Sequence, residues 1–174
     1  MINIKGFEIP NTTDELTVEQ FDRLNKINLE QEDHIEKWIA KFTYLGVNEE
    51  VFDEMNLEEF KAKVKEFNDI PTVDNERVFE VNIDGFDYVT SEAIGAKDLS
   101  LIEKCWKKDR TDFAADMLSI LFKRKDLGRK EHYSEAHIKH KKSLFKKQPC
   151  RLAMPHIIAV TQELVTSAEN ATTE

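Results

Sequence analysis

The stretch Thr111 to Lys123, Thr-Asp-Phe-Ala-Ala-Asp-Met-Leu-Ser-Ile-Leu-Phe-Lys, combines helical spacing with more apolar surface than any other part of the chain. Its apolar side chains recur three and four residues apart, and further ones widen that face until most of the helix is apolar. Thr111 stands before the run, where its hydroxyl can accept a bond from a backbone N–H at a helix start. A surface helix keeps a narrower apolar stripe, so we expect this stretch to form the central core helix.

Amphipathic helices are also indicated on both sides of this stretch, because apolar residues repeat there with the period of one helix face. The expected helices cover residues 17–27, 35–45, 57–67, 98–108, 134–147 and 155–165. The sequence therefore predicts a mainly α fold of short amphipathic helices.

One β-hairpin, at about residues 78–90, is predicted to pack on these helices. Phe79, Val81 and Ile83 alternate with polar residues, as in a strand with one buried face. Asp84-Gly85 is a typical two-residue hairpin turn. Closing the ladder there places Ile83 opposite Phe86, Val81 opposite Tyr88 and Phe79 opposite Thr90. A lone hairpin is only marginally stable in water, and the N-terminal arm is a candidate third strand.

The predicted organisation is one mainly helical domain over residues 15–165, between an extended arm and a disordered tail. The arm covers residues 1–14, and the tail, rich in Ser, Ala, Glu, Asn and Thr, covers 166–174. Within the domain we expect an acidic helical half (15–70), the hairpin (78–90) and a basic helical half (98–165).

The charge is divided along the chain. The protein has 174 residues and a net charge of -9, which argues against nonspecific binding to nucleic acid or anionic membranes. Residues 1–96 carry 9 Lys/Arg against 23 Asp/Glu, whereas residues 97–151 carry 16 against 8. The division suggests internal electrostatic complementarity or a polar surface that faces a partner.

Localisation is expected to be cytoplasmic. The chain has only two cysteines, which favours a reducing compartment over a disulfide framework. The first residues lack the apolar run of a signal peptide, and no apolar run is long enough to span a membrane.

Catalytic and metal chemistry find little support. A zinc site would need about four nitrogen or sulfur ligands, and the candidates are His132, His137, His140, Cys150 and His156. They show none of the ligand-pair spacings that make zinc motifs specific, so we expect no metal and no cofactor. Cys105 with His132 or His156 could form a nucleophile–base pair, but Cys105 adjoins Trp106 on an apolar face and is interpreted as a core residue. We therefore predict that the protein is not an enzyme.

A basic patch is the strongest polar feature of the sequence. It consists of Lys139, Lys141, Lys142, Lys146, Lys147 and Arg151. With Phe145 among the lysines, the segment 139–151 could supply phosphate contacts and one stacking ring, so a nucleic-acid-binding accessory protein is the alternative function. We favour a solvated helix face, because arginine is sparse and the other half of the chain is acidic.

Two segments resemble a known family. Glu-Leu-Thr-Val-Glu-Gln-Phe-Asp-Arg-Leu at 15–24 resembles the start of small helical bacteriophage tail assembly chaperones and related tail or baseplate assembly proteins. Tyr-Leu-Gly-Val-Asn-Glu-Glu-Val at 44–51 and Met-Asn-Leu-Glu-Glu-Phe at 55–60 are similar to their next helices. The matching region covers residues 15–67.

This resemblance implies a non-enzymatic protein that holds a tail or capsid component through protein–protein contacts. It places the protein in the host cytoplasm, or in the virion if it stays in the finished particle, and it is compatible with a homo-oligomer. Nucleic acid and membranes are not expected partners. Candidate partner-binding residues, if not ordinary core, are Phe52, Met55, Phe60 and Phe67.

Overall fold

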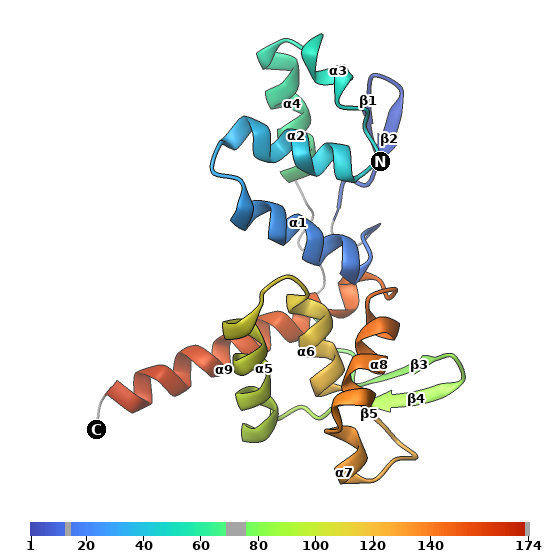
Figure 1. The fold of residues 1–174 in the computed structure, drawn as a ribbon, viewed down its shortest axis with the longest axis vertical. Helices are drawn as coiled ribbons and strands as arrows, with labels where there is room; N and C mark the ends of the chain where they lie inside the picture. Colours follow the sequence, from blue (N-terminus) through green and yellow to red (C-terminus); the bar gives the residue numbers. More distant parts are fainter. Residues whose placement is uncertain (13–14, 69–75, 173–174) are drawn as a thin grey trace.

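A computed structural model describes residues 1–12, 15–68 and 76–172, and its mainly helical architecture confirms the predicted fold class (Figure 1). The part up to residue 68 contains β1 (Ile2–Ile4), β2 (Phe7–Ile9), α1 (Val18–Glu30), α2 (His34–Tyr44), α3 (Glu50–Asp53) and α4 (Leu57–Asn68). The part from residue 76 contains β3 (Glu80–Ile83), β4 (Phe86–Val89), α5 (Ala96–Lys108), α6 (Phe113–Leu121), β5 (Lys123–Arg124), α7 (Arg129–His132), α8 (Glu135–Phe145), the 3₁₀-helix η2 (Cys150–Leu152) and α9 (Met154–Thr172).

The predicted hairpin forms in the predicted register. Ile83 lies opposite Phe86 and Val81 opposite Tyr88, and the backbone N–H of Thr90 donates to the carbonyl of Phe79 at 2.9 Å. The turn residues Asp84 and Gly85 both have positive φ, 52° and 82°, as this tight turn requires.

The third strand of this sheet is β5. The described part of the N-terminal arm, which was the candidate from the sequence, does not pair with the hairpin. Arg124 of β5 lies opposite Tyr88 of β4. The arm instead folds on itself, because Lys5 and Gly6 adopt positive φ and let β1 and β2 pair. This second hairpin buries Ile2, Ile4 and Ile9 against neighbouring helices. Residues 13–14 of the expected arm lie outside the described residues.

The C-terminal tail also differs from the expectation of disorder. α9 continues through Thr172, and in Figure 1 it extends away from the rest of the molecule. Residues 166–172 contain no Gly or Pro that would end a helix, which is why the helix can continue. Residues 173–174 lie outside the described part of the chain.

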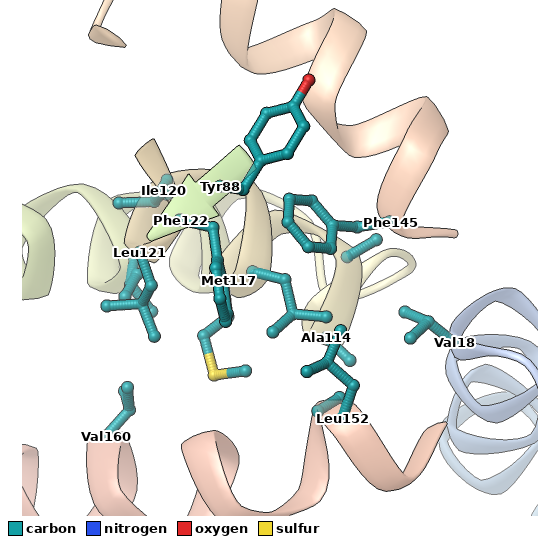
Figure 2. Packing of buried hydrophobic residues seen from close by; sticks show 14 of the residues in the cluster. Val18, Tyr88, Ala114, Met117, Ile120, Leu121, Phe122, Phe145, Leu152 and Val160 are labelled. Atoms are coloured by element: carbon teal, nitrogen blue, oxygen red, sulfur yellow. The ribbon is translucent and has the colours of Figure 1, made fainter. Parts of the chain in front are cut away.

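Buried apolar side chains form two clusters. The N-terminal cluster consists of Ile2, Ile4, Ile9, Leu16, Leu24, Ile27, Trp38, Phe42, Val47, Phe60, Phe67 and Cys150. The C-terminal cluster consists of Val18, Ile83, Tyr88, Ile102, Ala114, Ala115, Met117, Leu118, Ile120, Leu121, Phe122, Phe145, Leu152, Ala153 and Val160. Figure 2 shows that α6 residues fill the middle of the C-terminal cluster, which confirms α6 as the central core helix.

Helix α1 and the segment around Cys150 join the two clusters. Val18, at the start of α1, belongs to the C-terminal cluster, whereas Cys150 belongs to the N-terminal one. Backbone hydrogen bonds run between the same segments: Val18 N–H donates to Gln148 at 2.8 Å, and Cys150 N–H donates to Leu16 at 2.8 Å. Each cluster is therefore completed by a residue from the other part of the chain.

Candidate protein-docking site

The position of α1 is fixed by Asp22, a residue that the sequence did not single out. Asp22 is 1% exposed, and its carboxylate oxygens accept the N–H of Ala114 at 2.7 Å and of Ala115 at 3.0 Å. Thr111 was expected to cap this helix, but α6 begins at Phe113 and the carboxylate of α1 takes the capping role. A negative group there also suits the dipole of α6.

Burial raises the pKa of Asp22 to about 7, against the lowering effect of the bonds from Ala114 and Ala115; Asp112 and Asp116 raise it further. Periodicity cannot reveal a partner 92 residues away. The sequence did contain one signal that Asp22 is buried: it lies four residues after Val18, on the apolar face of the predicted helix.

Two lysines of α8 extend this junction. Lys142 Nζ lies 2.9 Å from an oxygen of Asp112 and 2.8 Å from one of Asp116. Lys146 Nζ lies 2.9 Å from Asp112 and 3.8 Å from Glu19 of α1. Burial alone would lower the pKa of Lys142, but its bonds to Asp116 and Asp112 raise it overall. The network holds α8 against α6, and its contact with Glu19 joins the acidic half to the basic half at an exposed position.

The predicted basic patch is consequently not one continuous cationic face. Lys141 is buried, and its Nζ donates to the carbonyl of Phe122 at 2.8 Å, where it satisfies the end of α6. The pKa of Lys141 is lowered to about 8, mainly by burial and to a smaller extent by the nearby charge of Lys123. With Lys142 and Lys146 in ion pairs, the exposed members of the patch are Lys139, Lys147 and Arg151.

The predicted partner-binding aromatics are core residues. Phe60 and Phe67 are 6% and 5% exposed and belong to the N-terminal cluster, and Phe52 and Met55 pack against it half-buried. The rings of Phe52, Phe60 and Phe67 each lie 6.1 to 6.4 Å from that of Phe42. Because α3 and α4 close over Phe42, these side chains do not form the open docking face that was one interpretation of the sequence.

The candidate metal ligands and nucleophile are separated. His156 is buried: its Nδ1 accepts from Arg77 at 3.3 Å, and its Nε2 lies 3.0 Å from the carbonyl of Val78. The rings of His132 and His137 lie 6.3 Å apart, whereas His140 is exposed and Cys150 is in the N-terminal cluster. Within residues 1–12, 15–68 and 76–172, no three His, Cys, Asp or Glu side chains are placed to share a metal ion.

Cys105 is not activated as a nucleophile. Cys105 lies on α5. The pKa of its thiol is raised, mainly by burial and to a smaller extent by the charge of Asp116. A raised pKa lowers the fraction of reactive thiolate at neutral pH. Cys105 packs against the C-terminal cluster, in agreement with its interpretation as a core residue.

A groove lies between α1 and α2. It has a volume of about 670 Å³. Its lining consists of Arg23, Ile27, Glu30, Gln31, Glu36, Ile39, Ala40, Thr43, Tyr44 and Glu49. The half-buried side chains of Ile39 and Ala40 supply apolar surface, and the exposed residues Glu30, Glu36 and Glu49 outnumber the single cation Arg23.

One further feature suits this groove to a bound chain. The ring of Tyr44 is 40% exposed, so its apolar surface is open to solvent beside the groove. The groove therefore offers apolar contacts and a negative rim.

Comparison with known proteins adds no relative. Neither a protein-family model, nor a curated protein, nor a solved structure matches this chain. None of the described helices is long and apolar enough to cross a membrane.

Proposed function

We propose that this protein is a non-enzymatic bacteriophage assembly or virion protein that acts through protein–protein contacts, in the manner of a tail assembly chaperone. The observation that supports this function best is the α1–α2 groove, with its apolar lining and acidic rim. The groove lies within residues 15–67, the region that resembles the chaperones, and it replaces the aromatic residues first considered as the contact surface.

The electrostatic arrangement supports the same function. Part of the positive charge of α8 is neutralised by ion pairs with Asp112, Asp116 and Glu19. The glutamates at the rim of the groove, Glu36 and Glu49, are exposed. An acidic groove disfavours phosphate groups and favours a polypeptide partner. The alternative function in nucleic-acid binding is left with the exposed side chains Lys139, Lys147 and Arg151, a small footprint for phosphate contacts.

Co-expression tests this function. The protein would be produced with each tail and capsid structural protein encoded by its phage, one at a time, and each mixture would be resolved by size-exclusion chromatography. We expect a stable complex of fixed stoichiometry with at least one of them, and more of that partner in the soluble fraction. A protein that elutes alone in every pairing would contradict the proposal.

A further inference from the structure

We propose that the α1–α2 groove binds one helix of a partner protein, with aliphatic residues at i, i+3 or i+4 and i+7, and Lys or Arg beside them. This inference rests on the proposed function, because it specifies the kind of partner segment that such an assembly protein would hold. It is carried by the arrangement of the lining residues on two packed helices and by their charge.

Most of the lining residues come from two packed helices, and a third helix is the element that packs most regularly against such a pair. On α1 they stand at positions 23, 27 and 30, and on α2 at 36, 39, 40, 43 and 44. The α1 set is spaced i, i+4, i+7 and the α2 set i, i+3, i+4, i+7, i+8, so each set lies on one face of its helix. A third helix laid between two packed helices completes a three-helix arrangement by ridges-into-grooves packing. Since α1 and α2 have 13 and 11 residues, the bound helix would be about three turns long.

The charge of the rim indicates a basic partner. Glu30, Glu36 and Glu49 surround the apolar lining; Glu30 has a partner in Lys26 at 3.5 Å, and no ion pair of Glu36 or Glu49 occurs within the described residues. Lys or Arg beside the aliphatic stripe of the partner would therefore meet exposed carboxylates without breaking an existing pair of Glu36 or Glu49. The long aliphatic parts of such side chains can also cover the exposed ring of Tyr44.

The charge also disfavours α9 of a second copy as the occupant. α9 carries an exposed apolar stripe, in which Ile158 is 39% and Val165 52% exposed. However, Met154–Thr172 contains Glu163 and Glu169 and no Lys or Arg. Placing this helix in an acidic groove would bring like charges together, which costs affinity. A basic helix from a different protein fits the groove better.

Synthetic peptides provide the test. The probe is a fluorescein-labelled 14-residue peptide with Leu at the i, i+3, i+4, i+7 and following stripe positions and Lys at the flanking ones. One control peptide has the same composition with the Leu positions scrambled, and a second has Glu in place of every Lys. Fluorescence anisotropy against the full-length protein should give at least tenfold tighter binding of the probe than of either control. Equal binding of the probe and the scrambled peptide would overturn the inference, because charge alone would explain it.

Variants of the protein locate the binding site. Ala40→Trp fills the groove, and Tyr44→Ala removes an exposed ring without entering either buried cluster. Each should weaken probe binding at least fivefold. Glu36→Gln with Glu49→Gln should weaken it several-fold and reduce its dependence on salt. The matched control is Glu58→Gln, an exposed glutamate on α4 outside the groove, which should leave binding unchanged.

Two outcomes separate this inference from the proposed function. If Ala40→Trp does not fold, as judged by circular dichroism, Tyr44→Ala and the double glutamine variant decide the test. If a structural-protein complex forms in co-expression and survives Tyr44→Ala and the double glutamine variant, the groove inference fails and the function stands. If the probe binds in the groove but no structural protein forms a complex, the assembly function fails instead.

Discussion

Asp22 illustrates how a single side chain can connect two distant parts of this chain. Its buried carboxylate accepts the N–H groups of Ala114 and Ala115 in the first turn of α6. Burial opposes ionisation, and the bonds from Ala114 and Ala115 favour it; burial dominates, so the pKa stands at about 7 instead of 3.8. Asp22 is therefore expected to lose its proton near neutral pH.

The first prediction concerns Asp22→Asn. Between pH 4 and 7 the folded state retains a proton that the unfolded state releases, so the stability contributed by Asp22 is full below pH 4 and is lost as the pH rises to 7. The asparagine variant lacks this titration. We therefore expect the free energy of unfolding of the wild type, relative to Asp22→Asn, to fall by a few kcal/mol from pH 4 to 8, as measured by urea denaturation.

Asp53→Asn, at an exposed position on α3, is the control for this measurement. Its stability should follow that of the wild type across the same pH range. Parallel profiles for the wild type and Asp22→Asn would show that Asp22 does not titrate in this range.

The second prediction compares two lysines of α8 that the sequence placed in the same basic patch. Lys141 is buried and bonds the carbonyl of Phe122, whereas Lys139 is exposed. Lys141→Ala removes buried packing and leaves that carbonyl without its donor, so we expect a loss of about 2–4 kcal/mol in the free energy of unfolding. Lys139→Ala should change it by less than about 0.5 kcal/mol. Similar effects for the two variants in urea denaturation would contradict the assigned burial.

At the scale of elements, the sequence predicts contacts between neighbouring segments but not contacts between segments far apart in the chain. The register of β3 and β4 was predictable because Asp84-Gly85 fixes the turn and the alternation fixes the face. Asp22 was not singled out and Lys141 was assigned to a basic patch, because each takes its partner from another element of the chain. The α1–α2 groove was missed for a related reason: its lining comes from two helices, and either helix alone has an ordinary amphipathic pattern.

Helix α8 gives the third prediction. With Lys141 buried and Lys142 and Lys146 paired, only a few cations of the predicted patch are exposed for phosphate. Salt-dependent affinity scales with the number of phosphates contacted, so we expect no measurable binding to single-stranded or duplex DNA or RNA at 150 mM salt, a roughly physiological ionic strength.

The control for this prediction is a variant with Ala in place of Lys139, Lys147 and Arg151. At low salt it should bind nucleic acid more weakly than the wild type. Binding at physiological salt that this variant abolishes would restore the nucleic-acid function.

At the scale of the whole molecule, the exchange of residues between the two clusters predicts cooperative unfolding. The chain has two tryptophans, and each reports on a different cluster: Trp38 belongs to the N-terminal one and Trp106 packs against the C-terminal one. In the variants Trp38→Phe and Trp106→Phe, the remaining tryptophan follows one cluster. We expect both fluorescence transitions in urea to have the same midpoint within error.

Removal of the junction should separate these transitions. Adding Asp22→Ala to each single-tryptophan variant removes the carboxylate that joins α1 to α6. The two midpoints should then differ. Midpoints that differ already without this change would show that the clusters unfold independently.

The place of Cys150 in the N-terminal cluster has a consequence for biosynthesis. A nascent chain on the ribosome presents β1 to α4 long before Leu16 and Cys150 can meet. Until Cys150 has been synthesised, the N-terminal cluster is incomplete and its apolar side chains are exposed to solvent. The N-terminal cluster is therefore completed late in synthesis. Truncated translation products that end before Cys150 should be prone to aggregation and degradation.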